Sequence, residues 1–245
     1  MPRKTSPTFS LSSKNLNDMM IRSLLLCCAS QLLAADNSPP DGFRSLLNGR
    51  DLSGWYGLNP HTGAKLTGEK KSADLRKQRA DFPSHWSVDQ HELVNLGTGP
   101  YAVTEEEFGD IELRIEYKTV PKADSGIYLR GNPQVQIWDI NQLDDPKKPD
   151  RSPRLGSGGL FNNTPKTSGR DPLVVADRSF GNWNSFRIIQ QGDITTVWLN
   201  DQLVVDHAKM ENFWDHTKPL PPKGALMLQT HGGEIRWRHI FVRQL

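Results

Sequence analysis

"ADSGIYLRGNPQVQIWDI", residues 123–140, is typical of two short β-strands joined by a turn at 131–133. Successive side chains of a strand point to opposite faces, so this stretch separates into two rows. One row is aliphatic and predicts a core-facing side: Ile127, Leu129, Val135 and Ile137. The other row combines hydrogen-bonding groups with large aromatic rings: Tyr128, Arg130, Gln134, Gln136 and Trp138. Two large aromatics are uncommon on a solvated face, so the second row favours a binding surface.

The same alternation recurs along most of the chain. Residues 111–120, "IELRIEYKTV", alternate between apolar and charged side chains. Residues 184–207 indicate three strands with turns at 191–193 and 200–201, and residues 224–245 indicate a hairpin that turns at 231–233. Closely spaced turns with few helical patterns predict an all-β sandwich of two antiparallel sheets, with a jelly-roll arrangement fitting best. The predicted core contains Leu113, Ile115, Ile127, Leu129, Val135, Ile137, Ile188, Val197, Leu199, Leu226 and Leu228.

Two segments depart from this pattern. Residues 57–85 are polar and rich in Lys and Arg, and within them "SADLRKQRADF" indicates a short helix beginning at Ser72. We favour a solvated, helical or irregular surface insertion, the alternative being a basic lid over an anionic ligand. Residues 141–159 form a second long connection. Loops of this length inside a compact domain are often functional, so we expect it to border a site.

The N-terminus has the residue order of a secretory signal peptide. Basic residues precede the apolar stretch "SLLLCCASQLLAA", which ends in small residues and is too short to span a bilayer. We therefore predict a signal peptide over residues 1–35, a linker over 36–41, a single domain over 42–245, and a secreted or periplasmic protein without stable membrane insertion. The alternative is a buried helix of the domain. Both cysteines, Cys27 and Cys28, lie in the predicted signal peptide.

Charge and motifs exclude several function classes. The formal net charge is only +2, and no basic stripe with interleaved aromatics is present, which argues against a nucleic-acid partner. The chain lacks a G-x-S-x-G elbow, a phosphate-binding glycine loop and an H-E-x-x-H pair. A site must therefore be assembled from separate strands. The sequence leaves the oligomeric state open.

The polar row of residues 123–140 suits a carbohydrate. Sugars present hydroxyl groups at their rims and C–H groups on their faces. Arg130, Gln134 and Gln136 offer planar, multidentate hydrogen bonding, while Tyr128 and Trp138 offer flat apolar surfaces. We therefore expect a small carbohydrate ligand.

Seven segments also resemble one protein family. They occur in the family's order: "GFRSLLNGRDLSGW", "DSGIYLRG", "VQIWD", "GSGGLFNN", "NWNSFRI", "WLNDQLVVDH" and "LQTHGGEIRWRHIFVRQL". The chain from Gly42 to Leu245 resembles the 3-keto-disaccharide hydrolase domain family. The resemblance implies a concanavalin-like jelly roll with its site on the concave sheet. It also implies hydrolysis of glycosides whose sugar carries a ketone at carbon 3. One departure is Gln134, at a position where the family often has an acidic residue.

Roles for the candidate residues follow from the chemistry of such a substrate, with elimination and then hydration as the expected route and direct displacement by two carboxylates as the rival. His231 is the candidate base, because the ordinary pKa of a histidine allows proton transfer near neutral pH. Arg130 would stabilise an enolate, and Asp139 or Glu116 would act as an acid or hold a divalent cation, although no ligand spacing establishes a metal site. The expected substrate contacts are Tyr128, Gln134, Gln136, Trp138, Gln229 and Arg238.

Structural alternatives stay open for four of these residues. Asp139 could cap a loop, Glu116 could be solvated, Arg238 could pair with a carboxylate, and His231 could be an ordinary turn residue. Three functions also stay open: a 3-keto-glycoside hydrolase, a non-catalytic carbohydrate-binding module, and a structural or adhesive surface domain.

Overall fold

The computed structural model describes Met1 and residues 38–148 and 151–245. Residues Pro39–Leu245 form one compact unit. The predicted signal peptide lies almost wholly outside the described residues, so it stays a prediction. Among the described residues, no helix has both the length and the apolar character needed to cross a membrane.

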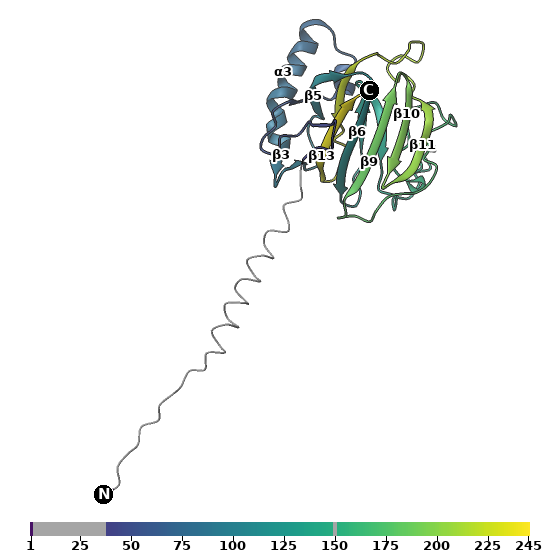
Figure 1. Cartoon of the computed structure of the whole chain (residues 1–245). Helices are drawn as coiled ribbons and strands as arrows, with labels where there is room; N and C mark the ends of the chain where they lie inside the picture. The colour runs from purple at the N-terminus through teal and green to yellow at the C-terminus, as the bar shows by residue number, and fades with distance from the viewer. Residues whose placement is uncertain (2–37, 149–150) are drawn as a thin grey trace. The chain divides into compact units, whose positions relative to one another are not determined.

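The compact unit contains two antiparallel sheets. The larger sheet has 8 strands, and Figure 1 shows five of its strands, β11, β10, β9, β6 and β13, side by side. Its order is β11 (Gln202–Lys209), β10 (Ile194–Leu199), β9 (Asn184–Gln191), β6 (Ile111–Thr119), β13 (Ile235–Gln244), β4 (Glu92–Asn95) and β3 (Trp86–Asp89), with β1 (Arg44–Ser45) paired to β13. The 5-stranded sheet has the order β2 (Trp55–Gly57), β5 (Ala102–Phe108), β12 (Gly224–Leu228), β7 (Ser125–Leu129) and β8 (Asn132–Ile137). The predicted two-sheet sandwich is confirmed.

The core lies between the sheets, where the aliphatic rows of their strands meet. Every residue of the predicted core is at most 2% exposed. Period-two alternation therefore identified the inward face correctly, because a strand that buries one face must place every second residue there. In β7 and β8 the opposite face is buried as well. Other segments of the chain must cover that face of the 5-stranded sheet.

One predicted hairpin is wrong. β12 pairs with β5 and β7 in one sheet, whereas β13 pairs with β4 and β6 in the other. Residues 229–234 therefore cross from sheet to sheet. The same alternation and glycine turn suit a hairpin and a crossing connection, so the sequence pattern could not separate them. The crossing places His231 at the rim of the sandwich.

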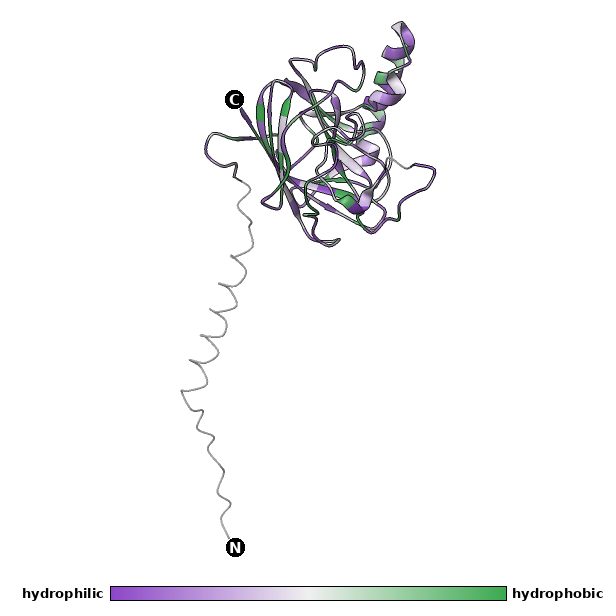
Figure 2. Cartoon of the chain, turned by 90° about the vertical axis from the view of Figure 1, so that its right-hand side faces the viewer, coloured by the Kyte–Doolittle hydropathy of each residue, from purple (hydrophilic) through white to green (hydrophobic). Residues whose placement is uncertain are grey.

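The predicted insertion is helical, but its helix begins earlier than expected. It consists of α2 (Pro60–Gly63) and α3 (Gly68–His85), and Thr67 occupies the N-cap position expected for Ser72. Lys70 and Lys71 extend the helix toward its N-terminus because straight-chain residues favour helix. α3 is mostly exposed and is drawn largely in hydrophilic colours in Figure 2. The remaining helix among the described residues is the 3-10 turn η1 (Pro153–Leu155) in the second long connection.

Candidate functional site

A cavity of about 410 Å³ lies on the outward face of the 5-stranded sheet, opposite the core. Six of the residues predicted to form a site line it: Tyr128, Gln134, Gln136, Trp138, Gln229 and His231. The remaining lining residues are Asn59, His61, Tyr101, Asp124, Arg151, Phe161 and Asn162. The structure thus brings together side chains from β7, β8, the insertion, the connection at 141–159, and the segments before β5 and after β12.

Glutamine side chains form the floor of the cavity. The amide nitrogen of Gln134 donates to the amide oxygen of Gln136, whose own nitrogen donates to Asp124 at 2.8 Å. The amide oxygens of Gln134 and Gln229 have no hydrogen-bond partner among the described residues, although both residues are more than nine-tenths buried. A buried acceptor without a partner is costly, so these two oxygens are suited to hydroxyl groups of a ligand.

Gly126 makes room for this floor. A Cβ atom at Gly126 would lie 2.9 Å from Cδ of Gln134, closer than real Cβ contacts come. A larger residue at position 126 would displace the Gln134 side chain. The glycine of the "DSG" segment therefore helps to set the position of Gln134.

A charged cluster lies at one side of the cavity. Oδ2 of Asp124 is 2.8 Å from Nδ1 of His231 and accepts a 2.5 Å hydrogen bond from Arg151. The hydrogen bond to Asp124, together with the charge of that carboxylate, raises the pKa of His231 above the ordinary 6.5. Asp124 also directs Nδ1–H of His231 toward itself, which leaves Nε2 available for proton transfer. The His231 side chain is 57% exposed, so it can exchange protons with solvent.

A second histidine lies on another wall. Nε2 of His61 is 2.9 Å from the hydroxyl oxygen of Tyr128, and Tyr101 packs edge-on against Tyr128. Burial, with a smaller contribution from the charge of His231, lowers the pKa of His61. Burial likewise raises the pKa of Tyr101 and of Tyr128 above the usual 10.0. His61 and both tyrosines are therefore neutral near pH 7.

An aromatic surface completes the lining. The ring of Trp138 packs edge-on against Phe161 at 5.1 Å, and the guanidinium of Arg151 lies 4.6 Å from the centre of the Trp138 ring. Trp138 is thus held from two sides. Its ring offers the flat apolar surface that the C–H face of a sugar needs.

Arg130 does not share the face of the glutamines, so that part of the predicted polar row is wrong. β7 ends at Leu129, and Arg130 adopts a left-handed backbone conformation with φ 54°. Its side chain turns away from the cavity and pairs with Asp110 at 2.5 Å. Alternation holds only within a strand, and Arg130 lies one residue past the end of β7.

Glu116, Arg238 and Asp139 do not line the cavity either. Glu116 and Arg238 belong to β6 and β13 of the 8-stranded sheet, where they pair with each other at 2.6 Å. Asp139 accepts hydrogen bonds from the backbone N–H groups of Lys122 and Asn141 at 2.8 and 2.9 Å. The positions of Arg238 and Asp139 match their structural alternatives, a paired charge and a loop cap. Glu116 is paired with Arg238 rather than solvated.

Seven lining residues were not identified from the sequence, and four of them carry the charged or titratable side chains described above. His61 lies in the insertion, for which the sequence favours a solvated surface. Tyr101 lies directly before β5. Arg151 belongs to the connection at 141–159 that was expected to border a site, and it does so. Asp124 had the clearest sequence signal of the four, because it directly precedes β7 in the opening stretch. An acid at the start of a strand lies beside that strand's polar row.

No metal site is apparent in the part of the chain that the structure describes. No three or more His, Cys, Asp or Glu side chains gather there in a group that could hold a metal ion.

Two structures from Parabacteroides distasonis ATCC 8503, both provisionally described as glycosyl hydrolases, share the fold. One has a TM-score of 0.53 at 17% identity and covers 85% of this chain and 99% of its own. The other has a TM-score of 0.51 at 22% identity and covers 66% of this chain and 91% of its own.

A search of curated protein sequences found no significant match. The sequence model of one domain family, however, matches residues 42–243. This match spans the sandwich, its insertion and every residue that lines the cavity. The chain therefore belongs to the family of 3-keto-alpha-glucoside-1,2-lyase-like domains.

Proposed function

We propose that this protein cleaves the glycosidic bond of 3-keto-glycosides by elimination, followed by addition of water. One observation carries the proposal. Two histidines face a single sugar-sized cavity, and their surroundings shift their pKa values in opposite directions. Such divergent pairs of titratable groups are characteristic of acid–base sites. Family membership supports the same class of substrate.

The substrate explains why a base is needed. A ketone at carbon 3 acidifies the hydrogen on carbon 2, because the resulting carbanion is delocalised as an enolate. The enolate then expels the oxygen at carbon 1, and water adds across the carbon 1–carbon 2 double bond. This route requires a base near carbon 2 and a stabiliser for the enolate oxygen.

His231 is the base in this scheme. Its Nε2 takes the proton from carbon 2, while Asp124 holds Nδ1–H and stabilises the imidazolium that forms. Arg151 replaces Arg130 as the stabiliser of the enolate, because Arg151 supplies the only guanidinium or ammonium group among the described residues that line the cavity. The imidazolium then releases its proton to solvent, which keeps the charge balanced over one turnover.

The alternative mechanism, direct displacement of the group at carbon 1, has less support. Glycosidases that use it place two carboxylates across the scissile bond. Among the described residues that line the cavity, Asp124 is the only carboxylate. Its pairing with His231 and Arg151 makes it a supporting group. Neutral His61 and Tyr128 would instead hydrogen-bond the departing oxygen, which takes its proton from solvent.

The decisive assay compares methyl 3-keto-glucoside with its unoxidised parent. We expect the purified protein to release methanol from the keto compound and not from the parent, as followed by mass spectrometry. Equal cleavage of both compounds would refute the elimination route. Binding of the keto compound without any cleavage would instead indicate a carbohydrate-binding module.

A further inference from the structure

A second hollow, which we call the Trp214 pocket, adjoins the cavity. It has a volume of about 380 Å³ and is lined by Leu58, Pro60, Gly63, Ala64, Lys71, Gly131 and Trp214. These residues come from α2 and its flanks, the start of α3, the β7–β8 turn and the connection that follows β11. Lys71 provides the only charged side chain of this lining within the described residues.

His61 connects the two hollows. It lines the sugar cavity, and its ring centre is 5.1 Å from that of Trp214 and 5.7 Å from that of Phe213. A molecule that extends from the sugar cavity past His61 therefore reaches the Trp214 ring. His61 is also the residue placed beside the departing oxygen in the proposed reaction, so the second hollow lies on the leaving-group side.

Trp214 is exposed but firmly held. Its side chain belongs to the exposed large apolar residues, at 38% exposure. Its indole N–H donates to the carbonyl oxygen of Gly131 at 2.8 Å, and its backbone N–H donates to Asn212 at 3.1 Å. The ring also packs edge-on against Phe213 at 5.0 Å. An exposed aromatic ring fixed in this way is a pre-organised surface for stacking, which lowers the entropic cost of binding.

We propose that the Trp214 pocket is the leaving-group subsite and that it takes a flat aromatic aglycone. This inference rests on the proposed function. The aliphatic lining offers almost no hydrogen-bonding side chains, in contrast to the glutamine floor, so a second sugar would leave its hydroxyl groups poorly matched. An aromatic aglycone departs as a phenol or phenolate. The ammonium group of Lys71, which makes no ion pair with the described residues, favours the developing negative charge.

The test uses two substrates that share the 3-keto-glucosyl group and differ in the aglycone, phenyl or methyl. For Trp214→Ala we expect kcat/KM to fall about tenfold with the phenyl compound and by less than twofold with the methyl compound. Trp214→Phe keeps a ring and should retain most of the phenyl activity. Trp198→Ala is the matched control, because Trp198 packs against Arg187 on the other sheet, away from both hollows.

A binding measurement separates this inference from the proposed function. In the His231→Ala background, calorimetry should show tighter binding of phenyl than of methyl 3-keto-glucoside, and Trp214→Ala should remove that difference. Retention of the difference, or equal weakening for both ligands, would overturn the subsite even if wild type cleaves both compounds. If wild type cleaves neither while the difference is present and depends on Trp214, the proposed function fails and the Trp214 pocket stands only as a binding site for an aromatic group.

Discussion

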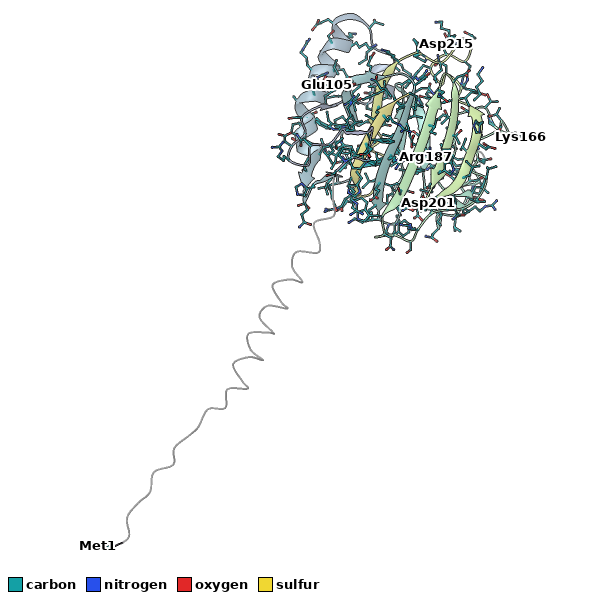
Figure 3. The ribbon with its side chains drawn as sticks, viewed as in Figure 1. Met1, Glu105, Lys166, Arg187, Asp201 and Asp215 are labelled. Atoms are coloured by element: carbon teal, nitrogen blue, oxygen red, sulfur yellow. The ribbon has the colours of Figure 1, made fainter. Side chains whose placement is uncertain are left out.

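The outward faces of the two sheets are built from different kinds of polar group. On the 8-stranded sheet, Glu112 accepts hydrogen bonds from Arg114, Arg187 and Arg243, and Arg187 is visible in the middle of that sheet in Figure 3. On the 5-stranded sheet the outward face carries neutral amides and phenols around the cavity. The charges of the first face pair with one another, whereas on the second face two amide oxygens have no hydrogen-bond partner among the described residues.

The two faces show how a stabilising polar face can be told from a binding face. Charged groups on an exposed sheet reach their partners within the same sheet and need no ligand. An unpartnered buried oxygen is not sufficient evidence either, because Gln190 on β9 also has one. What distinguishes Gln134 and Gln229 is that both residues line a cavity large enough for a sugar.

The largest effect on turnover is expected for the proposed base, His231, in comparison with the paired carboxylate of Glu116. His231→Ala should lower turnover of a 3-keto-glycoside about a hundredfold or more, the usual scale for loss of a general base. Glu116→Gln is the matched change on the other face and should leave turnover within twofold. Steady-state kinetics on both variants, with circular dichroism as a check of folding, measures this. A fully active His231→Ala variant would remove His231 from the mechanism.

The next effect concerns stability alone. The Glu112 side chain is 1% exposed beside its three arginines. Glu112→Gln should lower the free energy of unfolding by about 2 kcal/mol, because a charge-assisted hydrogen-bond network loses its anion. Activity should be unchanged. Denaturant unfolding and the keto-glycoside assay test the two halves, and a loss of activity without a loss of stability would contradict the assignment of this face.

The same change has a pH dependence of known sign. Burial works to raise the pKa of Glu112, but hydrogen bonds from Arg187 and Arg243 outweigh it, so the pKa lies below the usual 4.5. The anion therefore contributes stability above pH 4.5, and this contribution is lost as the pH falls through the lower folded-state value. The stability difference between wild type and Glu112→Gln should shrink in acid.

A smaller effect, on KM, is expected to distinguish two buried glutamines, Gln134 and Gln190. Gln134→Leu should raise KM about tenfold, because a sugar hydroxyl loses its acceptor. Gln190→Leu is the matched control, since Gln190 is equally buried but does not line the cavity. Both variants should change the free energy of unfolding by a similar amount, about 1 kcal/mol. Equal KM values for the two variants would contradict a substrate-binding role for Gln134.

The sequence predicted the sandwich and much of the cavity floor for one physical reason. Within a strand, position alone determines the face, so Gln134, Gln136 and Tyr128 could be assigned together. The same rule failed at Arg130, which follows the strand end. Alternation also says nothing about His61 and Arg151, because their positions depend on how the insertion and the connection at 141–159 fold over the sheet. Glu116 shows the remaining limit, since alternation gives a residue's face but not its sheet.

In the proposed reaction, the cavity around His231 cleaves a 3-keto-glycoside by removing the proton from carbon 2. The most direct measurement is the reaction in deuterium oxide, with the sugar product analysed by mass spectrometry at early times. A parallel incubation of the free keto sugar without protein corrects for spontaneous exchange. Elimination followed by hydration predicts one solvent deuterium at carbon 2 of every product molecule. Product that keeps its original hydrogen at carbon 2 would contradict the mechanism.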